Sequence, residues 1–392
     1  MLLVETRRDV ALEACSEAIA AADVGLESDD VPFIFRPASK FSPLVISFPH
    51  VGLRWPTSLL RPAPQVHFGR NADFEVHRLF PEASRRSATI QAIYSRLLVD
   101  LNRADDDVNP ELVPDHPAPR PRPGTGAPGT LGRIPNRGIL WDTAVGNIPI
   151  LSAPVTYAEL ELRLKRYYAP YYRALEILLA RRRERFGYAI LLEAHSMPSS
   201  VPGDIILGTL EGGSCSSEIE SRALDVLRAP DPVTGRSLDI RLNNPYRGGN
   251  LVRSFGRPEQ GIHALQVEVS RSLYMDESTF RVWAPPLSAV GGSAANRSHA
   301  RLLTHRRRRL DLLLSRLDHL LLSFTQAMLD PQVETAKTPL SSPRLNPAAP
   351  QQASPSSSSV PPCGDSLVQP DAPGINSRQI TLGPSNPKEP CQ

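Results

Sequence analysis

The sequence predicts an α/β domain built on a mostly parallel or mixed sheet, and three observations lead to this fold class. Short apolar segments typical of buried strands recur along the chain, and long segments of helical period lie between them. The chain has 392 residues, 41% of them hydrophobic and 22% charged, which is enough for a large hydrophobic core. Strands interspersed with long helices pack as a sheet covered by helices.

Four segments are predicted to be strands, at residues 43–48, 94–101, 188–193 and 263–270. The first three are short apolar runs, as expected for strands buried in a sheet. The fourth alternates strictly and places Leu265, Val267 and Val269 on one face. Glu268 falls on its opposite, polar face.

Two long helices are predicted. In the first, at residues 156–186, Thr156 and Glu159 form a capping box at the start and Pro170 is expected to kink the helix midway. The second, at residues 301–329, carries leucines close to helical period. Such helices are long enough to cover a sheet.

Charge and composition exclude several classes of protein. With 44 Lys and Arg against 41 Asp and Glu, the net charge of +3 creates no global field that favours nucleic acid or an anionic membrane. The basic run at 305–309 lies within the second helix and is interpreted as a solvated face. No apolar run spans a bilayer and the N-terminus lacks a signal-peptide core, so we expect a cytoplasmic protein. The 4 cysteines have no paired spacing that would indicate a disulfide framework or a cysteine zinc site.

Composition also sets the domain boundaries. Residues 331–392 are rich in Pro and Ser, and we expect a disordered tail there. Residues 110–132 are proline-rich and are predicted to form an extended loop; a GxGxxG match within it follows no strand and is not read as a dinucleotide site. Residues 40–330 then form the α/β domain, and residues 1–39 an N-terminal helical extension.

Two histidines directly follow predicted strands. His50 comes after the first strand and His195 after the third, so both imidazoles reach one crevice if these strands are neighbours. Two imidazoles and one carboxylate make a hydrolytic zinc site with an open position for water, and both Asp73 and Glu75 offer that carboxylate. Glu193 is expected to share the strand face of His195 and to orient either that residue or the local backbone. The alternative is that each histidine is a solvated or core-capping residue, and spacing alone does not decide.

Other polar residues suit the same chemistry. Glu268 is a candidate general base against a metal-bound water; alternatively, it forms an ion pair with Arg253 or Arg271. Arginine binds carboxylates in a bidentate fashion, so Arg103 and Arg253 suit an acidic, amino-acid-like substrate. Structural ion pairing is the alternative for these arginines.

Seven segments of the chain, taken together, resemble the N-formylglutamate amidohydrolase family over about residues 40–280. They are FPHVG at 48–52, DFEVHRLF at 73–80, SRLLVDLNR at 95–103, LLEAHSMPS at 191–199, LGTLEGGSC at 207–215, PYRGGNLVRSFGRP at 245–258 and GIHALQVEVSRSLYMDE at 261–277. The resemblance implies a phosphorylase/hydrolase-like, three-layer αβα fold with a mixed sheet. It also implies one zinc ion per chain.

Carried over residue by residue, the resemblance implies that His50, Asp73 and His195 bind zinc, with Glu75 in reserve for Asp73. It assigns the general base to Glu268. The blocks expected to shape the substrate pocket contain Arg96, Asn102, Arg103, Gly248, Gly249 and Arg253, the last as the group that stabilises the oxyanion or holds the α-carboxylate.

The implied reaction is hydrolysis of the amide bond of N-formyl-L-glutamate or a related small N-acyl amino acid, with a place in histidine breakdown. Four positions depart from the family pattern: Val51 replaces a serine, Glu193 and His77 replace aspartates, and Tyr172 replaces a histidine. A deacylase of other N-acyl amino acids or peptides therefore remains an alternative. A non-catalytic binding protein on the same fold is another, although the intact histidines and Glu268 argue against it.

Overall fold

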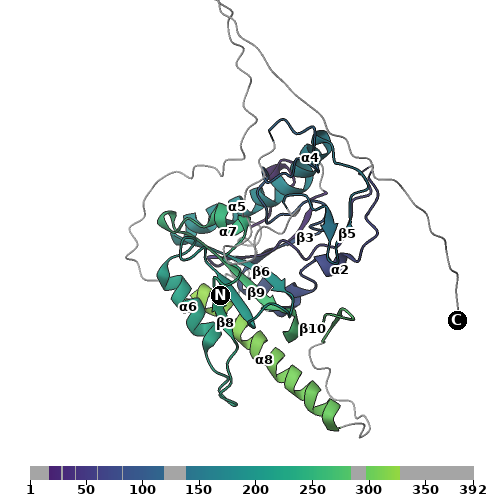
Figure 1. Cartoon of the computed structure of the whole chain (residues 1–392). Helices are drawn as coiled ribbons and strands as arrows, with labels where there is room; N and C mark the ends of the chain where they lie inside the picture. Colours follow the sequence, from purple (N-terminus) through teal and green to yellow (C-terminus); the bar gives the residue numbers. More distant parts are fainter. Residues whose placement is uncertain are drawn as a thin grey trace, which may run out of the picture. The chain divides into compact units, whose positions relative to one another are not determined.

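A seven-stranded sheet lies at the centre of the protein (Figure 1). Neighbouring strands are parallel in four pairs, β2–β3, β2–β6, β6–β9 and β7–β8, and antiparallel in two, β1–β3 and β7–β9, so the sheet is mixed, as predicted. In the order of the sheet, its strands are β1 (Phe33–Arg36), β3 (Ala88–Ala92), β2 (Leu44–Phe48), β6 (Ala189–Met197), β9 (Ile262–Ser270), β7 (Ile205–Gly208) and β8 (Ile240–Leu242).

The structure is a computed structural model that describes residues 17–27, 30–39, 41–59, 61–81, 83–118, 138–283 and 297–326. Of residues 84, 297–305 and 326 it describes the backbone alone. The predicted tail at 331–392 lies outside these ranges, as does the part of the proline-rich loop after residue 118.

Helices cover both faces of the sheet and complete three αβα layers (Figure 1). On one face lie α4 (Tyr157–Arg163), the π-helical η3 (Leu164–Tyr168), α5 (Ala169–Phe186), α7 (Asn250–Phe255) and the short η1 (Ala22–Val24). On the other lie η2 (Val76–Leu79), α3 (Ala83–Arg86), α6 (Ser217–Arg228), η5 (Arg271–Leu273) and α8 (Arg297–Gln326). The remaining short elements are α2 (Phe68–Asn71), η4 (Pro258–Gln260) and the hairpins β4 (Thr143–Ala144)–β5 (Ile148–Pro149) and β10 (Met275–Asp276)–β11 (Arg281–Val282).

The apolar core is divided between the two faces of the sheet. In β6, Ala189 and Leu191 join the cluster beneath α5 and α7, while Ile190 and Leu192 join the cluster beneath α6 and α8. A strand buried on both faces is apolar at every position, which explains why the third predicted strand reads as a continuous run.

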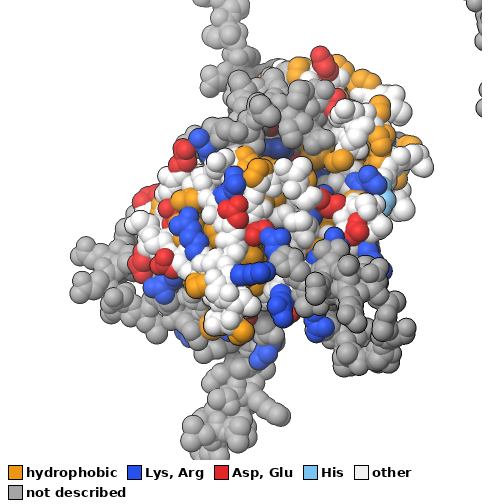
Figure 2. Space-filling view, turned by 60° about the horizontal axis from the view of Figure 1, so that its bottom comes forward, with side chains coloured by type: hydrophobic (Ala, Val, Ile, Leu, Met, Phe, Trp, Pro, Cys, Tyr) orange, Lys and Arg blue, Asp and Glu red, His pale blue; other side chains and the backbone are white. Residues whose placement is uncertain are grey.

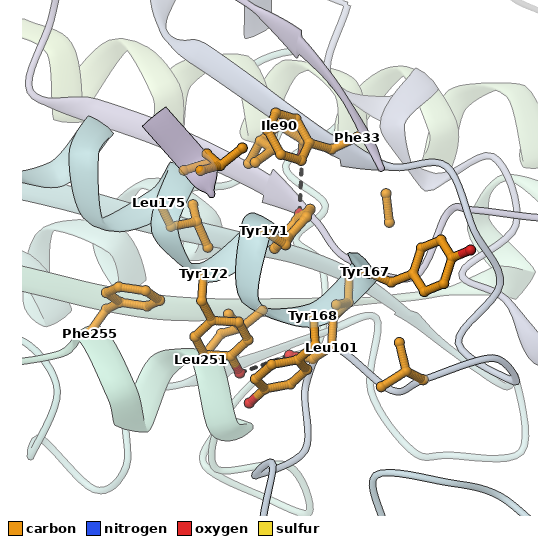
Figure 3. Close-up of a cluster of buried hydrophobic side chains, with 14 of the residues drawn as sticks. Phe33, Ile90, Leu101, Tyr167, Tyr168, Tyr171, Tyr172, Leu175, Leu251 and Phe255 are labelled. Carbon is orange, nitrogen blue, oxygen red and sulfur yellow. Dashed lines mark hydrogen bonds between the residues drawn. The ribbon is translucent and has the colours of Figure 1, made fainter. Parts of the chain in front are cut away.

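Tyrosines of the long helix connect it to the segments that carry the site (Figure 3). The hydroxyl of Tyr171 donates to the carbonyl of Ile90 in β3 over 3.3 Å. The hydroxyl of Tyr172 donates to the carbonyl of Leu101 over 2.9 Å. The ring of Tyr172 stacks on that of Tyr168, with centroids 4.3 Å apart. These buried contacts fix the segment around Leu101 against the helix.

The predicted helix over 156–186 is confirmed. The hydroxyl oxygen of Thr156 accepts the backbone N–H of Glu159 over 3.2 Å, and Gly187 ends α5 with a left-handed φ of 80°. The expected kink takes the form of the π-helical turn η3, which ends just before Pro170. A widened turn accommodates the backbone hydrogen bond that proline cannot donate.

The predicted strand over 94–101 is wrong. Tyr94 forms only an isolated bridge with Arg54, and the residues that follow it form turns. The strand in this region is β3, at 88–92, whose mixed residues ATIQA gave no apolar run. In the turn, the Asp100 side chain accepts the backbone N–H of Asn102 over 3.0 Å, a local hydrogen bond that competes with sheet pairing.

The expected domain boundary at residue 40 also differs from the structure. Strand β1 lies before this boundary, yet it pairs with β3 at the edge of the sheet, with Phe33 opposite Ala92. Glu17 forms a buried ion pair with Arg182 of α5. The described part of the N-terminal segment therefore belongs to the α/β domain.

The basic run in α8 is largely solvated, as predicted. Arg307 and Arg308 are exposed, Arg309 pairs with Asp204, and the guanidinium of Arg306 lies 5.0 Å above the ring of Trp283. Figure 2 shows acidic and basic side chains interspersed on one face of the molecule. Among the described helices, none is long and apolar enough to cross a membrane.

Candidate metal centre and active site

Two neighbouring parallel strands bring His50 and His195 together. Strand β2 pairs with β6, with Ser47 opposite Glu193. His50 follows β2 by two residues, whereas His195 lies within β6, which continues to Met197 instead of ending at residue 193. The two imidazole centroids are 4.9 Å apart and both rings are buried. Neighbouring strands therefore bring the two imidazoles side by side.

Asp73 completes a cluster of three side chains. One carboxylate oxygen of Asp73, Oδ2, lies 2.8 Å from Nδ1 of His195 and 3.4 Å from Nδ1 of His50. One ligand atom from each of the three residues lies within 4.8 Å of the others, an arrangement that suits a metal ion. Glu75, with a left-handed φ of 59°, directs its carboxylate to Arg78 instead, with Nε at 2.5 Å.

The protonation of His50 follows from its second nitrogen. Nε2 lies 2.7 Å from Oδ1 of Asp100, and a carboxylate can only accept, so the ring proton sits on Nε2. Nδ1 then presents a lone pair toward Asp73, and among the described residues this buried atom has no hydrogen-bond partner. A histidine whose far nitrogen donates to a carboxylate is typical of a metal ligand.

Asp100 is itself held by charge and hydrogen bonds. Its Oδ2 accepts from Nη2 of Arg96 over 2.7 Å and from Nε1 of Trp141 over 3.0 Å. Burial alone raises the pKa of Asp100, but Arg96 and His50 outweigh it and hold the pKa well below its usual range. Asp100 and Trp141 were not among the residues selected from sequence; the only signal for Asp100 is a charged residue among buried apolar neighbours.

The charges in the cluster oppose one another. Burial raises the pKa of Asp73, but hydrogen bonds from His195 and His50 outweigh it and lower the pKa. Burial lowers the pKa of His195, but Asp73, Glu193 and Glu268 together outweigh burial and raise that pKa well above its usual value. The protein therefore favours an ionised Asp73 between the two rings, which is the form that binds a cation.

Glu268 lies directly across from His195. The two residues are register partners on the adjacent strands β6 and β9. Oε1 of Glu268 accepts from Nε2 of Gln266 over 2.9 Å. Burial raises the pKa of Glu268 to about 7, while His195 lowers it. Arg271, the alternative partner from sequence, donates instead to Oγ of Ser196 over 3.2 Å. A carboxyl with this pKa suits a general base near neutral pH.

Asn102 and the two glycines meet beside His195. The amide nitrogen of Asn102 lies 3.2 Å from Nε2 of His195. The backbone N–H of Gly249 donates to Oε1 of Gln266 over 2.8 Å. A Cβ on Gly249 would lie 2.2 Å from the Asn102 amide nitrogen, so only glycine fits, and Gly248 has a φ of 125°.

The arginines expected to bind substrate lie at different places. Arg96 lies at the cluster, with its guanidinium 4.6 Å above the ring of Trp141. Nε of Arg103 lies 4.0 Å from Oδ2 of Asp100, and its side chain is 20% exposed. Arg253 projects into solvent from α7, and among the described residues it forms no hydrogen bond or ion pair with the cluster.

Tyr246 is a further residue near the site that was not selected from sequence. Burial raises its pKa to about 12, and the charges of Glu268 and Asp73 act in the same direction. The loop that carries Tyr246 passes close over β7, where a Cβ on Gly208 would lie 2.8 Å from the carbonyl carbon of Arg247. Its position beside the two carboxylates depends on this long-range packing.

The sequence profile of the N-formylglutamate amidohydrolase family matches residues 42–275. The chain belongs to this family. It is 34% identical over 251 residues to an N-formylglutamate deformylase from Pseudomonas aeruginosa, an alignment that covers 60% of this chain and 83% of the relative. It is 32% identical over 250 residues to an N-formylglutamate deformylase from Pseudomonas putida, with the same coverage, 60% and 83%.

A solved structure supports the same assignment. The N-formylglutamate amidohydrolase from Ralstonia eutropha JMP134 aligns with a TM-score of 0.57 and 28% identity, and the match covers 74% of this chain and 98% of that one. The family and the α/β fold predicted from sequence are both confirmed.

Proposed function

We propose that the protein is a zinc-dependent hydrolase that cleaves the amide bond of N-formyl-L-glutamate or a related N-acyl amino acid. The relatives named above as N-formylglutamate deformylases support the reaction class. The single observation that carries the proposal is the convergence of His50, Asp73 and His195 around ligand atoms within 4.8 Å of one another.

The donor set fits zinc. Two imidazoles and one carboxylate are a common ligand set of catalytic zinc and leave a fourth position open. Nδ1 of His50 is buried with no hydrogen-bond partner among the described residues, as expected for an atom that binds a metal. When bound, zinc lowers the pKa of water and polarises a carbonyl oxygen.

Glu268 is proposed as the general base. Its register position opposite His195 and its charge interactions with His195 and Asp73 support this role, and its pKa of about 7 suits proton transfer near neutrality. Glu268 takes a proton from the attacking water and delivers it to the leaving nitrogen. The products are formate, or another carboxylic acid, and a free amino acid.

The substrate is proposed to lie between Gly248, Gly249 and the arginines. The glycines leave the loop backbone open to close approach. Arg96 and Arg103 place two guanidinium groups beside Asp100, whereas Arg253 lies on the exposed side of α7 and does not add to this charge. Positive charge at this side of the cluster favours a substrate that carries a carboxylate. A cytoplasmic location and a role in histidine breakdown are proposed together with this substrate.

Metal content and hydrolysis of N-formyl-L-glutamate, measured on the same preparation, test the proposal. We expect about one zinc per chain and release of formate. Hydrolysis of other N-acyl amino acids but not of formylglutamate would move the substrate to the alternative deacylase. A protein with neither zinc nor turnover would overturn the proposal and favour the non-catalytic binding protein.

A further inference from the structure

Glu193 is a buried carboxylate without an evident structural role. It lies in β6, with none of its surface exposed. Among the described residues, neither of its carboxylate oxygens has a hydrogen-bond partner. Burying a carboxylate in this way destabilises a fold, because the group loses its hydration without gaining partners. Its presence at the centre of the sheet therefore calls for a role other than stability.

One of the polar atoms near this carboxylate belongs to His195. Glu193 and His195 are two residues apart in the same strand, so their side chains project from the same face. Oε2 of Glu193 lies 3.6 Å from Nε2 of His195. This is the nitrogen that faces away from Asp73, because Nδ1 of the same ring lies 2.8 Å from Oδ2 of Asp73.

A second side chain near this nitrogen cannot serve as an acceptor. The amide nitrogen of Asn102 lies 3.2 Å from Nε2 of His195. The orientation of the amide is set by its other end, since Oδ1 of Asn102 accepts the backbone N–H of Leu251 over 2.9 Å. An amide NH₂ only donates hydrogen bonds, so it cannot accept one from an Nε2–H group. The amide therefore serves Nε2 while that nitrogen is unprotonated; once Nδ1 binds a metal and the proton moves to Nε2, Glu193 offers the carboxylate oxygen that can accept it.

We infer that Glu193 is a positioning residue: it accepts a hydrogen bond from Nε2–H of His195 and so keeps Nδ1 of that ring free to hold a metal ion. The inference rests on the proposed function, because it requires a metal at the cluster. The 3.6 Å separation is longer than a hydrogen bond, and we expect it to shorten once Nδ1 turns from Asp73 to a metal. Asp100 serves His50 in the same way, over 2.7 Å.

A positioning role and a structural role predict opposite effects on the metal-free protein. In Glu193→Met, an apolar chain of similar length removes a buried charge that has no partner. The metal-free protein should then melt at the same or a higher temperature than the wild type. Zinc should nevertheless bind more weakly, because Nε2–H loses its acceptor. If Glu193 were purely structural, its replacement by Met would lower the melting temperature and leave the tautomer of the His195 ring unchanged.

The test uses the full chain with two substitutions, Glu193→Met and Glu193→Gln, and measures the zinc dissociation constant by chelator competition. We expect Glu193→Met to weaken zinc binding by about 10–100-fold. Glu193→Gln keeps a neutral oxygen acceptor, so its zinc affinity should lie between those of Glu193→Met and the wild type. Glu220→Gln is the matched control: this carboxylate accepts from the hydroxyl of Thr209 at α6 and should leave zinc affinity unchanged.

A second measurement does not depend on the variants. In zinc-loaded wild-type protein with ¹⁵N-labelled histidine, nuclear magnetic resonance should place the proton of His195 on Nε2. A proton on Nδ1, or zinc affinity in Glu193→Met within twofold of the wild type, would overturn the inference. Wild-type protein that binds no zinc would overturn the metal centre first, and the role of Glu193 with it. If the wild type binds zinc and the Glu193 variants bind it equally tightly, the role of Glu193 is overturned but the metal centre is not.

Discussion

Nε2 of His50 lies 2.7 Å from Oδ1 of Asp100, fifty positions later in the chain. This contact sets the tautomer of His50 and so determines which of its nitrogens faces Asp73. Arg96 and Trp141 hold the other oxygen of Asp100 in place. The proposed metal centre therefore rests on buried side chains whose hydrogen bonds are already formed.

Asp100→Asn tests this network. The amide loses the charge that Arg96 and Nε2–H of His50 bond to, so zinc affinity should fall by about 10–100-fold. The free energy of unfolding should fall by about 1–3 kcal/mol, because buried donors lose a charged acceptor. Chelator competition and urea unfolding measure the two effects. Asp318→Asn, which removes a partly exposed partner of Arg86, should leave zinc affinity unchanged. Unaltered zinc binding in Asp100→Asn would contradict the proposed support of His50.

His195→Ala tests the metal centre itself. Removal of one of three ligands should abolish stoichiometric zinc and all hydrolysis, as measured by metal analysis and formate release. His263 provides the control, since it is buried in the neighbouring strand β9 but accepts the backbone N–H of Ser216 outside the cluster. His263→Ala should retain zinc even if it unfolds at a lower temperature. An active His195→Ala protein that keeps its metal would exclude His195 as a ligand.

The pH dependence of kcat/KM tests Glu268. A general base must be deprotonated, and burial raises the pKa of Glu268 to about 7, so activity should fall as the pH drops through and below that value. A bound metal ion adds positive charge nearby and moves this decline to lower pH. Glu268→Gln should bind zinc normally and lose about 10²–10⁴-fold in kcat. Near-normal turnover in that variant would mean that another group is the base.

Apolar pattern predicted the central strands because central strands are buried on both faces. β2, β6 and β9 each read clearly in the sequence, whereas β3 has a mixed composition and was missed. Residues 94–101 are as apolar as a strand, but their leucines are buried by packing against helices and turns. Burial and strand pairing leave the same signature in sequence, and only the long-range contacts separate them.

The site residues also divide into those that local sequence predicts and those that depend on long-range contacts. His50, His195 and Glu268 stand on or next to strongly patterned strands, so local sequence was sufficient to select them. Asp73 was chosen over Glu75 by family resemblance, and the structure brings Asp73 to the histidines because the left-handed backbone at Glu75 turns that side chain away. Asp100 and Tyr246 act through contacts across the fold, which no local pattern encodes.

Gly249→Ala tests the close packing beside His195. The backbone φ of Gly249 is −91°, which alanine adopts freely, so any effect comes from the added methyl group. That methyl would lie 2.2 Å from the Asn102 amide nitrogen and must displace the side chain that contacts His195. We expect kcat/KM to fall at least tenfold, a loss of about 1.4 kcal/mol or more, together with a destabilisation of about 1–3 kcal/mol from overpacking.

Gly212→Ala separates this steric effect from ordinary glycine replacement. Gly212 has a left-handed φ of 82°, and no atom lies within 4 Å of its added Cβ, so alanine there introduces backbone strain without a clash. The control should lose stability by about 1 kcal/mol and keep its kcat/KM. Equal losses of kcat/KM in both variants would show that the kinetic effect does not depend on a clash with Asn102 and would contradict the prediction. A loss of kcat/KM confined to Gly249→Ala would show that the position of the Asn102 amide governs activity, since both variants lose stability but only the methyl group at residue 249 meets that amide.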